Sequence, residues 1–199
     1  MLSSSRLPLA HPRNAPWGVR EEATSFLAAQ LHSGRARPRN QDVTKDPNGD
    51  HCWSVILAGG DGRRLLPLTR LVTGDNRPKQ FCPLLTGGKT LLEDTRTRAA
   101  KFCALERTVF VLNGTHEPFY VTELADVSPK LLVVQPENRG TLPAILASLA
   151  RIVELDQQAI TGFFPCDHHY SREDVFVKGT QRGFRAAHGS TKHHQPPRT

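Results

Sequence analysis

Apolar and polar positions divide the 199-residue chain into a patterned middle and two polar ends. In the middle, four short apolar runs rich in β-branched and aromatic residues alternate with segments whose apolar residues recur at helical spacing. The runs predict strands at 53–58, 108–112, 130–134 and 159–164. Strands that alternate with helices indicate an α/β fold with a mostly parallel sheet.

The helices predicted between these strands have recognisable starts. Thr90 and Glu93 form the pattern of a capping box, which predicts a helix to about Phe102. Thr141 is the predicted N-cap of a long amphipathic helix. Two further helices are predicted at 117–125 and 171–187.

The two ends of the chain lack this pattern. Residues 1–50 are rich in Pro, Ser, Gly and Arg, and the last stretch has no apolar run. Such segments cannot bury enough apolar area to offset the entropy of ordering. We therefore expect a disordered basic extension at 1–50, one domain at 51–187 and a disordered tail at 188–199.

Charge and cysteine content narrow the possible partners and location. The net charge of +7 suits an anionic partner, but the basic residues form no stripe interleaved with aromatics, which total 7%. We therefore expect no nucleic-acid partner.

The four cysteines form no C-x-x-C pair and are expected to be reduced, buried thiols. No apolar run approaches the roughly 20 residues of a membrane span, so we expect a cytoplasmic protein without membrane contact.

The first predicted strand empties into a glycine-rich turn containing Gly59, Gly60 and Gly62, which is followed by Arg64 and Lys79. Glycines let backbone N–H groups converge on an anion, and the cations supply opposing charge, so the turn predicts a phosphate site. The dinucleotide-binding fingerprint is excluded because its third glycine is absent. A P-loop is disfavoured because proline stands where its first glycine would be.

The loops after three of the four strands are rich in residues that bind phosphates, bases or metals. They are the glycine turn and the segments 135–141 and 165–169. Because ligands of open α/β sheets bind at the carboxyl ends of the strands, we expect these loops to share one rim.

Four motifs occur in the same order as in the sugar nucleotidyltransferases, and within these the chain most resembles the mannose-1-phosphate guanylyltransferases. The motifs are G-G-x-G-x-R-L-x-P-L-T at 59–69, R-P-K-Q-F at 77–81, Q-P-E-N-R-G-T at 135–141 and F-P-C-D-H at 164–168. The resemblance covers roughly residues 53–187. It implies a Rossmann-like nucleotide-diphospho-sugar transferase fold, represented here by its N-terminal part only.

The resemblance also implies roles for matching residues. Arg64, Lys79 and Asp167 would be catalytic, with Asp167 the ligand of a Mg²⁺ cofactor. The implied nucleotide-binding residues are Gly59, Gly60, Gly62, Arg64, Gln135, Gly140 and Thr141. The implied reaction is in-line transfer of a guanylyl group from GTP to mannose 1-phosphate, giving GDP-mannose and pyrophosphate without a protein nucleophile.

The chain departs from the family at several points. Arg63 stands where a small hydroxyl residue is expected, Leu142 replaces an alanine, and Thr73–Asn76 is expected to be a loop insertion. The chain is also shorter than the family's catalytic domain, so we expect a truncated fold and an inactive chain as one outcome. A non-catalytic nucleotide-binding remnant therefore stays open as an alternative, and a basic RNA-associated module is a weaker one.

Overall fold

The computed structural model describes residues 51–85 and 87–192. It contains a four-stranded sheet in the order β3-β2-β1-β4, in which every neighbouring pair is parallel. The strands are β1 (Cys52–Leu57), β2 (Thr108–Asn113), β3 (Leu132–Gln135) and β4 (Ile160–Pro165). The predicted α/β fold is confirmed, and each strand lies within two residues of its predicted bounds.

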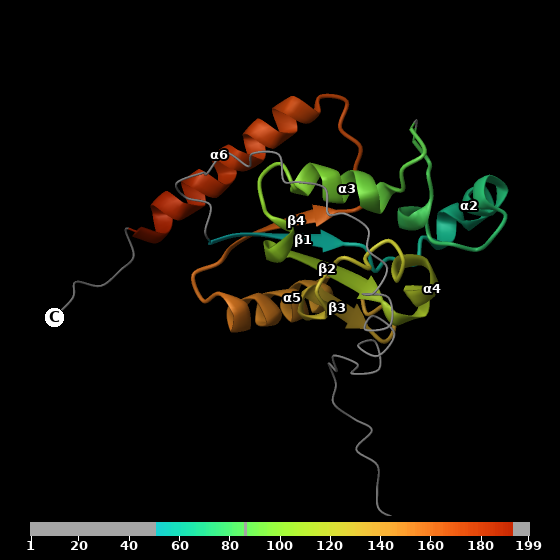
Figure 1. The fold of residues 1–199 in the computed structure, drawn as a ribbon, viewed down its shortest axis with the longest axis horizontal. Coiled ribbons are helices and arrows are strands. Elements are labelled where there is room, and N and C mark those ends of the chain that lie inside the picture. Colours follow the sequence, from blue (N-terminus) through green and yellow to red (C-terminus); the bar gives the residue numbers. More distant parts are fainter. Residues whose placement is uncertain (1–50, 86, 193–199) are drawn as a thin grey trace, which may run out of the picture.

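Helices cover both faces of this sheet. Figure 1 shows α3 (Leu91–Ala99) and α6 (Glu173–Lys192) over one face and α5 (Thr141–Leu155) over the other. The central strands are buried on both sides, and Val55 and Ile56 of β1 are fully inaccessible. This explains why the strands of the sequence are continuous apolar runs rather than alternating ones.

The order of the strands creates a switch point beside β1. The chain passes from β1 to β2 and then to β3 on one side, and returns to pair β4 with the opposite edge of β1. The connections that leave β1 and β4 therefore diverge at their carboxyl ends, as in Rossmann-like folds, where this divergence opens a ligand crevice. In Figure 1 the strand arrowheads point toward α2 (Leu66–Thr73), which lies at that end of the sheet.

The α2 helix was not predicted, and the expected loop insertion at Thr73–Asn76 is its ordered C-terminal end. Gly74 is the C-cap, with a φ of 78°. The carboxylate of Asp75 accepts hydrogen bonds from Thr73 Oγ1 at 2.9 Å and from the backbone N–H of Arg77 at 3.1 Å. The segment is thus a capped helix end that turns the chain toward Lys79.

Of the two helix caps predicted from the sequence, one is confirmed and one is wrong. The capping box of Thr90 and Glu93 is confirmed, since each side chain accepts a hydrogen bond from the other residue's backbone N–H. The predicted Thr141 cap is wrong. Gly140 is the N-cap of α5, Thr141 is its first helical residue, and the cap makes no side-chain hydrogen bond. Gly140 has a φ of 86°, a conformation that disfavours any residue with a side chain.

Three helix ends differ from the prediction. The α3 helix stops at Ala99, before Phe102, and α4 (Glu117–Tyr120) is a single turn that does not reach Ala125. The α6 helix continues to Lys192, so the disorder expected from residue 188 is wrong for 188–192. The expectations for 1–50 and 193–199 lie outside the described residues.

Two further expectations concern the cysteines and the membrane. All four cysteines are free and buried, as predicted. Burial raises the pKa of the Cys103 thiol to about 11, which makes that thiol unreactive. None of the helices that the structure describes is long and apolar enough to cross a membrane.

Candidate active site

The glycine turn follows β1 directly and approaches the backbone of Lys79. Gly62 has a φ of 62°, in the left-handed region, and a Cβ built on it would lie 3.4 Å from the Lys79 backbone nitrogen. Gly60 has open space around its Cα and needs no such close approach. Of these two predicted glycines, Gly62 is the one whose left-handed backbone disfavours a side chain.

A buried glutamine that the sequence did not single out holds this turn. Gln80 is 2% exposed, and its Nε2 donates to the carbonyl oxygens of Ala58 and Gly60, both at 2.8 Å. It lies on the 3₁₀ helix η3 (Lys79–Phe81), immediately after the predicted catalytic lysine. The same turn of helix therefore contacts the backbone of the glycine turn and carries Lys79.

Lys79 and Asp167 meet across the switch point. Lys79 Nζ lies 2.5 Å from Asp167 Oδ2, although one residue follows the glycine turn and the other follows β4. The hydrogen bond from Lys79 lowers the pKa of the Asp167 carboxyl below its ordinary value. The side chains are 26% and 38% exposed, so both can reach a ligand in solvent. The structure thus brings together two of the three residues predicted to be catalytic.

The carboxyl ends of β2 and β3 continue the same rim. Asn113 Nδ2 donates to Asp61 Oδ1 at 3.1 Å, which ties the glycine turn to the end of β2. Asn113 is paired in register with Gln135, the last residue of β3. Gln135 is 2% exposed, and within the described part of the chain its Nε2 has no hydrogen-bond partner. Such an unpaired buried donor is costly unless a ligand supplies the acceptor.

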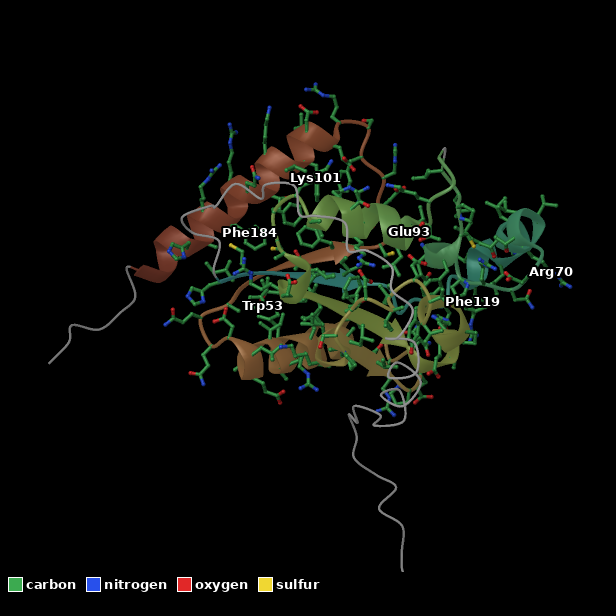
Figure 2. All side chains as sticks on the ribbon, in the orientation of Figure 1. Trp53, Arg70, Glu93, Lys101, Phe119 and Phe184 are labelled. Carbon is green, nitrogen blue, oxygen red and sulfur yellow. The ribbon has the colours of Figure 1, made fainter. Side chains whose placement is uncertain are left out.

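A cavity of about 340 Å³ opens at this part of the rim. Its polar wall comes from the glycine turn and from the loops after β2 and β3, and its apolar wall comes from α2, from Pro78 just before η3, and from α4. The lining residues are Asp61, Arg63, Leu66, Asn76, Pro78, Asn113, Thr115, His116, Phe119, Glu137 and Asn138. Figure 2 shows Phe119 at this end of the sheet and Trp53 farther back along it. None of the predicted site residues lines the cavity, although Asp61 and Arg63 stand beside them in sequence.

The cavity contains a buried histidine. His116 is 6% exposed, and its Nε2 lies 3.9 Å from Asp61 Oδ1. Burial lowers the pKa of the imidazole, and the nearby Asp61 charge opposes that shift. The lowered pKa therefore favours an uncharged His116 ring beside the Asp61 carboxylate at neutral pH. Neither Asn113 nor His116 was predicted as a site residue. The sequence did hold one indication of them, since both lie at or just after the carboxyl end of the strand predicted at 108–112.

Three predicted residues are not joined to this arrangement. Arg64 is exposed on the 3₁₀ helix η2 (Arg63–Leu65), and its side chain forms no ion pair or hydrogen bond with any other residue the structure describes. Gly140 and Thr141 are exposed at the start of α5. Arg63 faces Asp61 instead, with its Nε 3.5 Å from Asp61 Oδ2.

Asp167 offers a partly exposed carboxylate for a metal ion at the rim. Residues 51–85 and 87–192 contain no group of three side chains able to hold a metal by themselves. Mg²⁺ is commonly held by one or two carboxylates together with substrate phosphates and waters. Asp167 therefore fits an ion that arrives with a nucleotide, rather than a protein-only metal centre. Together with the turn amides and Lys79, the rim can bind and orient a phosphate chain.

Several bacterial proteins are similar to this chain in sequence. The xanthan biosynthesis protein XanB of Xanthomonas campestris is 32% identical over 124 residues, which are 61% of this chain and 25% of that protein. The mannose-1-phosphate guanylyltransferase of Salmonella montevideo is 32% identical over 129 residues, 64% of this chain and 26% of that protein. The alginate biosynthesis protein AlgA of Pseudomonas aeruginosa is 31% identical over 136 residues, 67% of this chain and 27% of that protein.

A solved structure agrees with the sequence comparisons. The crystal structure described as mannose-1-phosphate geranyltransferase from Thermus thermophilus matches with a TM-score of 0.55 and 30% identity, over 66% of this chain and 37% of that one. The chain spans about a quarter of the length of XanB, of the Salmonella guanylyltransferase and of AlgA. A family model described as nucleotidyl transferase matches residues 53–188, well over half of the sequence. The chain therefore belongs to the nucleotidyl transferase family.

Proposed function

We propose that the chain is the nucleotide-binding part of an enzyme of the mannose-1-phosphate guanylyltransferase type. Its reaction is transfer of a guanylyl group from GTP to mannose 1-phosphate, which gives GDP-mannose and pyrophosphate. The observation that carries the proposal is the Lys79–Asp167 pair, placed beside the glycine turn at the switch point of the sheet. The names of the relatives support the choice of guanine and mannose.

In this proposal each part of the rim has one task. The backbone N–H groups of the glycine turn receive the phosphate chain. Lys79 places its ammonium against the charge that develops on the α-phosphate, where a fixed cation is most effective. Asp167 would hold Mg²⁺, which supplies charge neutralisation to the phosphates when bound. The low pKa of its carboxyl keeps Asp167 ionised for that task at neutral pH.

The base would occupy the rim between β2 and β3. The unpartnered Nε2 of Gln135 is a buried donor, and the O6 atom of guanine is an acceptor that could receive its hydrogen bond. Uracil and cytosine also present carbonyl acceptors, so this donor alone does not define guanine. The cavity of about 340 Å³, which Asn113 lines, has the size of a site for a small ligand.

The proposal is tested by measuring pyrophosphate release from GTP and Mg²⁺ with mannose 1-phosphate, using glucose 1-phosphate as the matched control. Release that depends on mannose 1-phosphate supports the full reaction. Equilibrium binding of GTP, ATP and UTP, each with Mg²⁺, is measured on the same preparation. Preference for ATP or UTP over GTP would contradict the guanylyl assignment.

A second candidate function is nucleotide binding without turnover. This candidate needs only the parts that bind a nucleotide, namely the glycine turn and the Lys79–Asp167 pair, which lie within the described residues. Binding of GTP with Mg²⁺ in the absence of pyrophosphate release would support this candidate against the first. Release of pyrophosphate at a rate that rises with mannose 1-phosphate would exclude it.

A further inference from the structure

We propose that Gln80 is a positioning residue of the nucleotide site, whose buried amide fixes the glycine turn so that the N–H groups of Gly59 and Asp61 are presented to a phosphate. The identity of the ligand rests on the proposed function. The orientation of the two N–H groups rests on the geometry of the chain alone.

The Gln80 amide uses both of its N–H donors on one short piece of backbone. Its Nε2 lies 2.8 Å from the carbonyl oxygen of Ala58 and 2.8 Å from that of Gly60. A side-chain –NH₂ group has two donors, so this pairing leaves neither for another partner. Because Gln80 is 2% exposed, water cannot replace these bonds without opening the structure.

These two bonds also set the direction of two N–H groups. A trans peptide is planar, and its carbonyl oxygen points opposite to the N–H of the next residue. The carbonyl of Ala58 points toward Gln80, so the N–H of Gly59 points away from it. The carbonyl of Gly60 likewise points toward Gln80, and the N–H of Asp61 points away. Gln80 therefore orients the N–H groups of Gly59 and Asp61 toward the side opposite its own amide.

Both donors are available for a ligand. Within the ranges that the structure describes, neither the N–H of Gly59 nor that of Asp61 has a hydrogen-bond acceptor. The Asp61 carboxylate would repel a phosphate, but Asn113 Nδ2 contacts it at 3.1 Å and Arg63 Nε lies 3.5 Å away. Converging backbone N–H groups with a partly neutralised carboxylate make an anion-binding concavity.

The helical turn that carries Gln80 is anchored in the core. Gln80 lies between Lys79 and Phe81 on η3, and Phe81 is 1% exposed. The Phe81 ring stacks on Phe119 and meets the edge of His116, each with ring centroids 6.0 Å apart. One rigid turn of helix thus sets the turn amides and the Lys79 cation in a fixed relation, which is the condition for electrostatic preorganisation.

The test compares Gln80→Met with the control Gln157→Met, an exposed glutamine after α5. Methionine keeps the length and approximate volume of the side chain but donates no hydrogen bond. NMR order parameters of the backbone N–H groups at 59–62 are expected to fall from about 0.85 to below about 0.6 in Gln80→Met, with no change in Gln157→Met or in the N–H groups of β2. Affinity for GTP with Mg²⁺ is expected to fall about tenfold in Gln80→Met alone.

A measurement on the unaltered chain keeps the inference testable if Gln80→Met does not fold. Amide proton resonances of Gly59 and Asp61 are followed by NMR during titration with GTP and Mg²⁺, and separately with inorganic tripolyphosphate. Downfield shifts at these two amides, larger than those of β2 amides, support the inference. Binding of either ligand without shifts at Gly59 and Asp61 would overturn the role of Gln80 and leave the proposed function standing. No binding of either ligand would overturn both.

Discussion

Lys79 Nζ and Asp167 Oδ2 lie 2.5 Å apart, although 88 positions separate the two residues in the sequence. β4 pairs with β1, so Asp167, which follows β4, and Lys79, which follows the glycine turn after β1, meet at the carboxyl ends of these neighbouring strands. Two motifs that are distant in the chain are therefore parts of one site. Their proximity places a cation and an ionised carboxylate side by side at the switch point of the sheet.

Asp167→Asn should affect stability little. Both partners are partly exposed, so solvent screening limits the pair to less than about 1 kcal/mol. The pKa of Asp167 is lowered by Lys79, so the pair stabilises the fold above the ordinary pKa of aspartate, and that contribution is lost as the pH falls through the folded-state value. Urea unfolding at about pH 7 and about pH 3 checks this. A loss above about 2 kcal/mol at neutral pH would show that the pair is structural.

Glu123 should make stability decrease as the pH rises. Burial raises the pKa of its carboxyl to about 7, although Thr90 Oγ1 donates to it at 2.7 Å. The folded state therefore binds the proton of Glu123 more tightly than the unfolded state does. The stabilisation of the fold by this proton is complete below about pH 4.5 and is lost as the pH rises through about 7. Relative to Glu123→Gln, the unaltered chain should lose on the order of 1–2 kcal/mol between about pH 5 and about pH 8, after allowance for screening.

Thermal unfolding of both proteins across that pH range tests the role of Glu123. The difference between the two melting temperatures isolates this carboxyl from other titrating groups, because they are common to both chains. Parallel curves would mean that the Glu123 carboxylate is ionised at no cost in the folded state.

Asp156 should be important for stability because it satisfies a buried donor. Trp53 is 5% exposed, and its indole N–H donates to Asp156 Oδ2 at 2.9 Å. His51 Nδ1 lies 3.0 Å from the same carboxylate, so Asp156 links the start of β1 to the end of α5. Asp156→Ala should lower the free energy of unfolding by about 2 kcal/mol, since the indole N–H loses its partner. The exposed Asp174→Ala is the matched control and should cost less than about 0.5 kcal/mol. Equal losses would refute this role.

Gly62→Ala and Gly60→Ala should differ. Gly62 has a φ of 62° and would bring a Cβ to 3.4 Å from Lys79 N, whereas a Cβ on Gly60 meets no atom within 4 Å. Gly62→Ala should destabilise the chain by about 1–2 kcal/mol through backbone strain. Gly60→Ala should remain within about 0.5 kcal/mol of the unaltered chain. Chemical denaturation of both variants decides the matter, and a larger loss for Gly60→Ala would contradict the turn geometry.

The strands and the α3 cap could be predicted from the sequence because their signals are local. Buried parallel strands are continuous apolar runs, and a capping box needs only Thr90 and Glu93. The α2 helix was missed because its apolar residues do not mark a buried face. Leu71 is 84% exposed, and Thr69 is the buried residue of the helix. The Thr141 cap failed because glycine occupies the position just before the helix.

The candidate site was predictable only where a motif carried it. Lys79 and Asp167 were found because each stands in a motif, and the order of the strands brought them together. Gln80 stands in the same motif as Lys79, but its role was missed because its two carbonyl partners are 22 and 20 positions away in the sequence. Asn113 was missed because its role depends on the Asp61 carboxylate, a contact across 52 positions. Such contacts depend on tertiary structure rather than local pattern.

Calorimetric titration of the full chain with GTP and Mg²⁺ tests the central claim most directly. The claim is that a nucleoside triphosphate binds across the Lys79–Asp167 pair. Lys79→Ala and Asp167→Asn are compared with Lys178→Ala and Asp174→Asn, whose residues are exposed on α6. We predict one bound nucleotide per chain, affinity weakened about tenfold or more by each site variant, and no change in either control. Absence of binding, or equal affinity in all five proteins, would contradict the account.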